Sequence, residues 1–243
     1  MPAASLKTPL VLIPGLLCNE ALWQHQVTGL RDITDPWIAD VTRSDSMAGL
    51  ASDILSAAPF ERFALAGLSM GGYVAFEIWR RAPERIVQLG LFSTSARADT
   101  PAQIERRLNL IELAKRGRFI GIGAALLPLL VHADRQQDSL LVNTVKRMAK
   151  ETGGPAFIRQ EHAIMHRADS VRDLARITCP TLILCGREDV LTPLDRHEEM
   201  AAGIKGAQLA IIERCGHLIT LEQPESVNRA MREWLTNPHR KVD

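Results

Sequence analysis

A serine stands between two glycines in the hexapeptide Gly67-Leu68-Ser69-Met70-Gly71-Gly72, where an apolar strand pattern gives way to a helical one. Residues 62–66 have the pattern of a short buried strand, and residues 73–81 have helical periodicity. A turn this sharp brings strand and helix so close that a Cβ at position 67 or 71 would collide with neighbouring atoms, and it holds the serine in a strained conformation. The pattern therefore predicts a strand, a tight turn and a helix, with Ser69 presented at the turn as a nucleophile.

A serine hydroxyl is a poor nucleophile at neutral pH, so it needs a histidine base and an acid that orients the histidine. His217 is the best candidate base, because it follows a strand pattern directly and sits in a glycine-marked loop. Asp189 is the best candidate acid, because it also comes just after a strand pattern, where open α/β sheets place their ligands. We therefore predict a triad of Ser69, Asp189 and His217. Two nearby carboxylates are alternative acids: Glu188 and Asp195.

Attack on a carbonyl also requires donors for the negative charge that develops on its oxygen, and these are commonly backbone N–H groups. Met70, immediately after the serine, is the first predicted donor of this oxyanion hole. The second is expected from the loop after the first strand, where Gly15 permits a tight turn. We predict Leu16 as that donor, with Leu17 as the alternative.

Short apolar runs alternate with helical patterns in the first and last parts of the chain, which indicates a parallel sheet with helices on both faces. The predicted strands are 10–14, 37–41, 63–68, 86–92, 181–185 and 208–212. The intervening segment has helical patterns interrupted by glycines, and no strand pattern. We therefore predict one α/β domain, residues 1–96 and 173–243, interrupted by a helical cap at residues 97–172.

The composition argues against several classes of partner. The 243 residues carry 29 basic and 28 acidic side chains, for a net charge of +1, so nothing favours nucleic acid or an anionic membrane. The apolar run near the N-terminus is too short for a signal peptide or a membrane span. Four cysteines without metal or redox spacing predict reduced thiols and a cytoplasmic protein.

We expect no cofactor and no metal. His162 and His166 are four residues apart and could share a helical face, but no third ligand is evident in the sequence. Surface or cap positions are the better interpretation of this pair. The oligomeric state is left open by the sequence.

Three blocks of the sequence resemble those of the α/β-hydrolase superfamily: Gly67 to Gly72, Gly186-x-x-Asp189-x-x-x-Pro193, and Gly216-His217-Leu218 with Gln223-Pro224-Glu225. The likeness covers nearly the whole chain and is to small, lid-bearing bacterial serine hydrolases: carboxylesterases, enol-lactonases, perhydrolases and C–C bond hydrolases. It implies the triad named above and a helical cap between the family's sixth and seventh strands. The family's first two strands are missing, so about six strands are expected.

The oxyanion loop departs from the resemblance, because Pro14-Gly15 stands where many relatives have His-Gly. The donated group is a backbone N–H further along, so catalysis is expected to survive the change.

These features together predict hydrolysis of carboxylic esters through an acyl-Ser69 intermediate, with a small-molecule ester or lactone as partner. The same triad would serve an enol-lactonase or a C–C bond hydrolase, with perhydrolysis as a side activity, and a ligand-sensing receptor of this fold is a further alternative. The apolar run 124–131 is expected to line an acyl pocket or to pack on the catalytic domain. Because no arginines or lysines cluster near the site blocks, we expect a neutral ester with a small or medium acyl chain.

Overall fold

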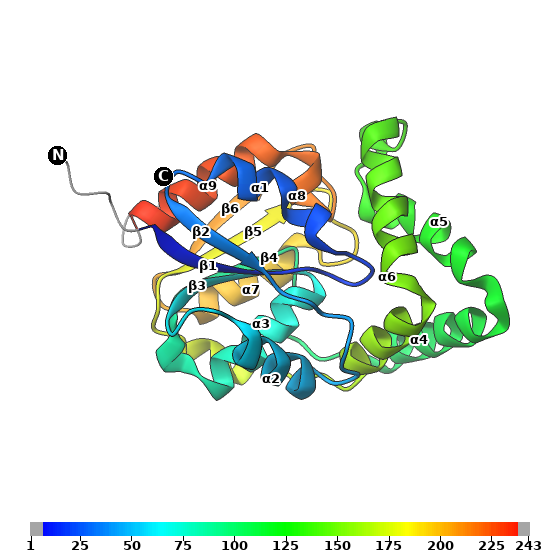
Figure 1. The fold of residues 1–243 in the computed structure, drawn as a ribbon, viewed down its shortest axis with the longest axis horizontal. Helices are drawn as coiled ribbons and strands as arrows, with labels where there is room; N and C mark the ends of the chain where they lie inside the picture. Colours follow the sequence, from blue (N-terminus) through cyan, green and yellow to red (C-terminus); the bar gives the residue numbers. More distant parts are fainter. Residues whose placement is uncertain (1–6, 238–243) are drawn as a thin grey trace.

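The computed structural model describes residues 7–237, and its centre is a six-stranded sheet in the order β2-β1-β3-β4-β5-β6 (Figure 1). Every neighbouring pair of strands is parallel. This confirms the predicted α/β fold and the expected number of strands. The strands are β1 Thr8–Ile13, β2 Thr34–Ile38, β3 Phe63–Leu68, β4 Ile86–Phe92, β5 Thr181–Gly186 and β6 Gln208–Ile212.

Helices cover both faces of the sheet (Figure 1). One face carries α1 Gln24–Gly29, α8 Ile219–Glu222 and α9 Pro224–Thr236, and the other carries α2 Met47–Ala57, α3 Met70–Arg81 and α7 Leu194–Gly203. Strand β1 explains why the strands are apolar throughout. Its Leu10 and Leu12 enter the core on one face, and Val11 and Ile13 enter the core on the other.

Strand β2 begins earlier than the sequence suggested. The prediction placed a strand on the apolar run 37–41, whereas the observed strand is Thr34–Ile38 and includes Pro36. Its register is set by pairing with β1, in which Thr8 faces Thr34. Because β2 lies at the edge of the sheet, the N–H that Pro36 lacks is tolerated there.

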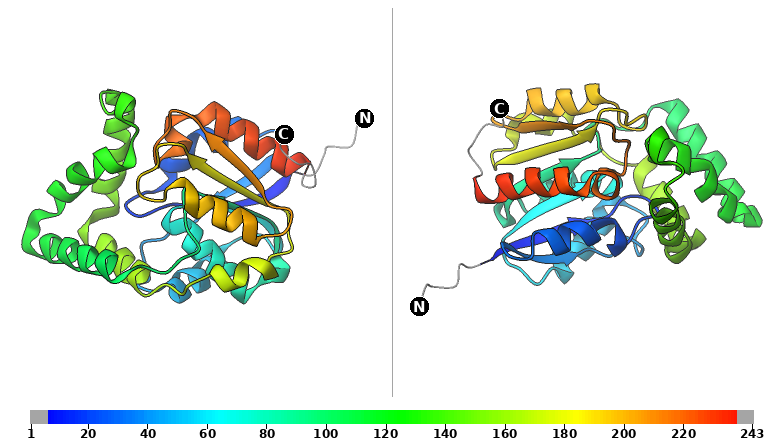
Figure 2. Two further views of the ribbon diagram at one scale, coloured as in Figure 1. Left: turned by 180° about the vertical axis from the view of Figure 1, so that it is seen from behind. Right: turned by 90° about the horizontal axis from the view of Figure 1, so that it is seen from above.

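The cap helices stand beside the sheet and are inserted between β4 and β5 (Figures 1 and 2). They are α4 Pro101–Leu113, α5 Phe119–Leu130 and α6 Ser139–Met165. Helix α6 bends at Gly153, whose φ of 78° is non-helical. The exact division of the chain after residues 96 and 172 stays a prediction.

The remaining helical turns are short. Four are 3-10 turns, Glu20–Trp23, Pro83–Arg85, Ala133–Arg135 and Val171–Arg176, and Ala114–Arg118 forms a π-turn between α4 and α5. Over residues 7–237, none of the helices combines the length and the apolar character that crossing a lipid bilayer requires.

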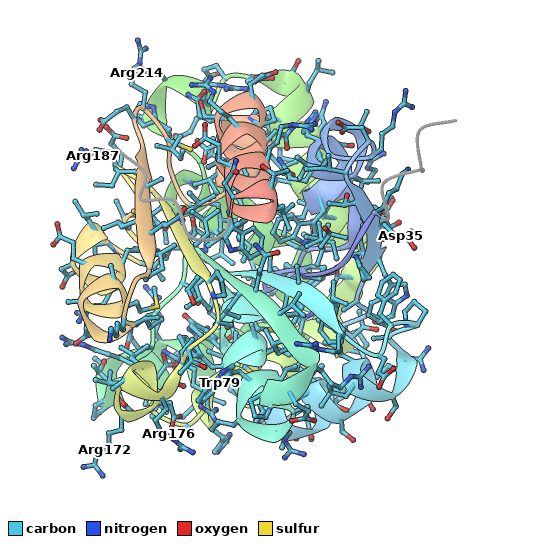
Figure 3. The ribbon with its side chains drawn as sticks, turned by 90° about the vertical axis from the view of Figure 1, so that its left-hand side faces the viewer. Asp35, Trp79, Arg172, Arg176, Arg187 and Arg214 are labelled. Atoms are coloured by element: carbon cyan, nitrogen blue, oxygen red, sulfur yellow. The ribbon has the colours of Figure 1, made fainter. Side chains whose placement is uncertain are left out.

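Arginines at the outer edge of the molecule point away from the core, as Figure 3 shows for Arg187 and Arg214. Arg187 forms an ion pair with Glu213 at 2.6 Å, and Arg214 forms one with Asp134 at 2.8 Å. Each of these two positive charges is therefore neutralised by an acidic partner.

The turn between β3 and α3 has no room for side chains at two of its glycines. A Cβ on Gly67 would meet the carbonyl of Gly71, and a Cβ on Gly71 would meet the carbonyl of Ile13. Both obstacles are backbone atoms, which cannot move aside as a flexible side chain can.

We expect Gly67→Ala to lower the free energy of unfolding by about 3 kcal/mol or more, because the added methyl group displaces packed backbone. Urea denaturation measures this. Gly121→Ala is the control: a Cβ at Gly121, in helix α5, would meet no atom within 4 Å, so it should stabilise the protein by about 0.5–1 kcal/mol. A Gly67→Ala variant as stable as the wild type would contradict the close packing of the turn.

Candidate active site

Ser69 occupies the strained position predicted for it. It lies between β3 and α3 with φ 57° and ψ −117°, in the left-handed region that costs a residue other than glycine of order 1–3 kcal/mol. Two hydrogen bonds hold this conformation. The Ser69 N–H donates to the Phe92 carbonyl at 2.9 Å, and the Thr94 hydroxyl donates to the Ser69 carbonyl at 2.8 Å.

His197 supports this turn indirectly, through its hydrogen bond to Thr94, and the sequence did not indicate this role. Its Nε2 accepts the Thr94 N–H at 3.1 Å, and its Nδ1 lies 3.3 Å from the Pro193 carbonyl. These partners define a neutral ring with the proton on Nδ1. Burial lowers the pKa of His197 to about 4, although the charge of Asp189 opposes the shift. The ring therefore stays neutral at physiological pH.

His217 and Asp189 form a buried pair at the carboxyl ends of the strands. His217 Nδ1 lies 2.8 Å from Asp189 Oδ2, and both side chains are almost fully buried. The carboxylate also accepts the N–H groups of Leu191 and Thr192 and the Thr192 hydroxyl, at 2.9, 3.0 and 2.7 Å. Burial alone would raise the pKa of Asp189, but the charge of His217 and these hydrogen bonds hold it below its ordinary value.

The two alternative acids lie elsewhere. Glu188 is exposed and accepts the Cys215 N–H at 2.9 Å, and Asp195 is exposed on α7 beside Arg196. Of the three predicted acids, the structure brings Asp189 to the histidine.

Ser69 and His217 line the same cavity, which has a volume of about 170 Å³. Within residues 7–237 their side chains form no hydrogen bond with each other, a common situation before a substrate tightens the site. The described N–H groups of Met70 and Leu16 likewise have no backbone or side-chain acceptor, so both are free to bind an oxyanion.

Leu17, the alternative donor, is already engaged. Its N–H donates to Gln160 Oε1 of the cap at 3.1 Å, and Gln160 Nε2 donates to the Val41 carbonyl at 3.1 Å. This buried glutamine anchors the predicted oxyanion loop, and its partners lie more than a hundred residues away in the chain. The geometry therefore favours Leu16 over Leu17 as a donor.

The cap supplies most of the apolar cavity wall. The predicted apolar run contributes Leu126, Leu129 and Leu130, while Val131 packs into the core. Val145 and Met148 of α6 complete this wall. Arg106 and Arg107 of α4 also reach the cavity, although they are far in sequence from the blocks that carry the predicted triad.

Glu222 holds the loop that carries His217 in place, although no motif in the sequence marks this residue. Its Oε2 accepts the N–H groups of His132 and Gly216 at 2.8 and 3.2 Å, and its Oε1 accepts that of Leu218 at 3.2 Å. Burial raises the pKa of Glu222, although these backbone donors oppose the shift. The loop is tied to the cap as well, because His217 and Leu218 both donate to the carbonyl of Leu130, each at 3.1 Å.

His162 lies on the last turn of α6 and His166 directly follows that helix; their rings are stacked, with the centroids 6.5 Å apart. Among the described residues, no group of three or more histidine, cysteine or acidic side chains is arranged to hold a metal ion.

Ser69 in its strained turn, His217 of the buried histidine–aspartate pair and Leu16, whose N–H is free, line one cavity at the end of a parallel sheet that carries a helical cap. The sequence model of the alpha/beta hydrolase family matches residues 10–230, and the chain belongs to that family.

The similar proteins include two esterases. The structure of a thermophilic esterase from Thermogutta terrifontis, with malate bound, has a TM-score of 0.88 and 28% identity, covering 96% of this chain and 91% of that one. The pimeloyl-[acyl-carrier protein] methyl ester esterase of Nitrosomonas europaea is 26% identical over 230 residues, 89% of this chain and 91% of that protein.

A third relative is named for another substrate. The 2-hydroxy-6-oxononadienedioate/2-hydroxy-6-oxononatrienedioate hydrolase of Paraburkholderia xenovorans is 26% identical over 209 residues, 84% of this chain and 72% of that protein. Hydrolysis is the property that the three names share, and the chain is a hydrolase of this fold.

We expect Glu222→Gln to lower kcat about 100-fold with little change in KM, because an amide nitrogen cannot accept all the N–H groups that the carboxylate holds, and the histidine moves. Steady-state kinetics on an ester substrate measures kcat and KM separately. Glu225→Gln, three residues along and exposed, is the matched control and should behave as the wild type. An unchanged kcat in Glu222→Gln would remove Glu222 from the positioning of His217.

His197 predicts how stability changes with pH. Its pKa is about 4 in the folded protein against an ordinary 6.5, so between these values the unfolded chain binds a proton that the folded chain does not. The stabilisation is complete above pH 6.5 and is lost as the pH falls to 4, amounting to about 3 kcal/mol. Urea denaturation from pH 7 to 4 should show this loss.

The His197→Gln variant should lack this part of the pH dependence, since glutamine can accept the Thr94 N–H without titrating. His25→Gln, at an exposed position on α1, should retain it. If the free energy of unfolding of His197→Gln changed with pH as steeply as that of the wild type, the pH dependence would belong to other groups.

Proposed function

We propose that the protein hydrolyses carboxylic esters through a covalent acyl-Ser69 intermediate, with His217 as general base and acid and Asp189 as its orienting partner. The observation that carries the proposal is the cavity that the strained Ser69 and His217 both line, with Asp189 hydrogen-bonded to His217 behind it. The free N–H groups of Met70 and Leu16 are the proposed oxyanion hole.

The first half of the reaction forms the acyl-enzyme. Ser69 Oγ attacks the ester carbonyl carbon while His217 Nε2 takes the hydroxyl proton, and the carbonyl electron pair moves onto oxygen, where Met70 and Leu16 stabilise it. The tetrahedral intermediate then collapses, and the leaving alkoxide takes the proton from His217 and departs as an alcohol. Asp189 stabilises the imidazolium and keeps the Nδ1 proton directed toward itself.

The second half uses water in place of the serine. His217 removes a proton from water, and the hydroxide attacks the acyl carbon to form a second tetrahedral intermediate. When this intermediate collapses, His217 gives the proton to Ser69 Oγ and the carboxylic acid leaves. The same steps would open a lactone, and an enol-lactonase or C–C bond hydrolase is the alternative within this mechanism.

The cavity favours a small or medium acyl group. Its volume of about 170 Å³ lies below the range of about 300–1,000 Å³ that is usual for drug-sized ligands. The apolar wall formed by α5 and α6 suits an alkyl chain. The four cysteines are free thiols, which suits a reducing compartment, and we place the proposed reaction in the cytoplasm.

Ser69→Ala is expected to lower the hydrolysis of p-nitrophenyl esters by about 10⁴-fold or more, because the nucleophile is lost while the fold is kept. Initial rates over a series of acyl lengths measure this, and the optimum length sizes the acyl pocket. Ser56→Ala, at an exposed position on α2, is the matched control and should retain full activity.

Substantial turnover by folded Ser69→Ala would refute the acyl-serine mechanism. A folded wild type that cleaves no ester would refute the esterase proposal, and lactones and C–C substrates would then be compared on the same two proteins. Ligand binding without turnover of any of these would indicate a sensing role.

A further inference from the structure

Four charged side chains form a buried cluster where the cap meets the catalytic cavity. Arg107 Nε donates to Asp99 at 2.6 Å, and its Nη1 donates to Glu161 at 2.7 Å. Arg167 Nη1 donates to the other oxygen of Asp99 at 2.6 Å, and its guanidinium lies 4.1 Å from the centre of the Tyr73 ring. Neither carboxylate is exposed, and three members of the cluster, Asp99, Arg107 and Glu161, line the cavity. None of these charges is used by the triad.

Among the three cluster members that line the cavity, these bonds leave one acceptor atom and one donor group free. Both oxygens of Asp99 are occupied, but Glu161 Oε1 is buried and has no hydrogen-bond partner among the described residues. Arg107 Nη2 likewise forms no hydrogen bond within residues 7–237. A buried carboxylate oxygen without a donor costs free energy, and such an atom in a native cavity calls for a partner. Burial also raises the pKa of Glu161, against the opposing charge of Arg107.

The charges in the cluster cancel, since two guanidinium groups face two carboxylates. An anionic ligand would approach the free oxygen of Glu161 with like charge, and a cationic one would approach Arg107 with like charge. A neutral group that donates one hydrogen bond and accepts another would meet neither penalty. An amide or a hydroxyl has this character.

We propose that Glu161 and Arg107 form a binding subsite for an uncharged amide or hydroxyl group of the substrate. Its N–H or O–H donates to Glu161 Oε1, and its oxygen accepts from Arg107 Nη2. The inference rests on the proposed ester hydrolysis and narrows the substrate class. The substrate is an ester or lactone whose apolar part contacts Leu126, Leu129 and Met148 and whose second polar group reaches α4 and α6.

The test compares esters that differ only in one end group. Methyl esters of graded chain length would end in a carboxamide, a hydroxyl, a carboxylate or an isopropyl group; the carboxamide, carboxylate and isopropyl ends are nearly equal in shape. In the wild type we expect the carboxamide or hydroxyl ester to exceed the isopropyl ester in kcat/KM by about 10- to 100-fold at its best length. Comparing the carboxamide ester with the hydroxyl ester shows which of the two groups, an amide or a hydroxyl, the subsite prefers.

In Glu161→Gln this ratio of kcat/KM values should fall at least about tenfold. If the glutamine oxygen keeps the hydrogen bond from Arg107, the glutamine NH₂ group takes the place of Oε1, and it cannot accept a hydrogen bond from the substrate. The ratio is measured within one variant, so a change in folded fraction cancels. Glu112→Gln, at an exposed position on the same helix as Arg107, is the matched control and should keep the wild-type ratio.

An isopropyl ester that is cleaved as fast as the carboxamide and hydroxyl esters would overturn the subsite. So would a ratio that is unchanged in Glu161→Gln. Preference for the carboxylate ester would overturn it in favour of anion binding, for which Arg106, exposed on the same wall, is available.

Failure of the subsite and failure of the esterase proposal can be separated. If no ester is cleaved, calorimetry with hexanamide, hexan-1-ol and hexanoate tests the subsite without chemistry. Binding of the amide or alcohol that weakens at least about tenfold in Glu161→Gln would support the subsite even though the esterase proposal had failed. Binding that is equal in the two proteins, or found for hexanoate alone, would overturn it, as would no binding at all.

Discussion

The strained conformation of Ser69 is the constraint on which the other parts of the site depend. A serine with φ 57° is unfavourable in isolation, and it persists because β3, α3 and β1 pack around it without space for a side chain at Gly67 or Gly71. The Thr94 hydroxyl and the buried neutral ring of His197 complete the support. The same turn places Ser69 in the lining of the cavity and starts helix α3 at Met70, whose N–H forms no hydrogen bond with the described residues. One local geometry therefore supplies both the proposed nucleophile and a proposed oxyanion donor.

The cap is joined to both loops that serve this turn. Gln160 of α6 binds the N–H of Leu17, beside the proposed donor Leu16. At its other end, the cap offers the Leu130 carbonyl to His217 and the His132 N–H to Glu222. A displacement of the cap would therefore move the oxyanion loop and the histidine loop together. Hydrogen bonds thus join the cap directly to the loops that carry Leu16 and His217.

The cavity wall has two different parts. Leucine and methionine side chains of α5 and α6 form an apolar part. Asp99, Arg107 and Glu161 form a charged part whose charges cancel together with Arg167, and the exposed Arg106 lies beside it. Apolar contact favours alkyl groups of many shapes, whereas a buried donor and acceptor reject groups that cannot pair with them. Selectivity is therefore expected from the charged part, and the apolar part mainly supplies affinity.

The local patterns of the sequence were sufficient for the sheet and for the identity of the proposed triad. Buried parallel strands are continuous apolar runs, and the turn at Ser69 demands glycines at set positions, so short-range sterics is visible in the sequence. The edge strand β2 was misplaced because its register comes from pairing with β1 rather than from its own residues. Gln160, Glu161, His197 and Glu222 are polar residues without a local signature, and their partners lie as far as 143 residues away. Only the tertiary structure brings such residues to their partners, because long-range hydrogen bonds depend on the folded arrangement and leave no periodic pattern in the sequence.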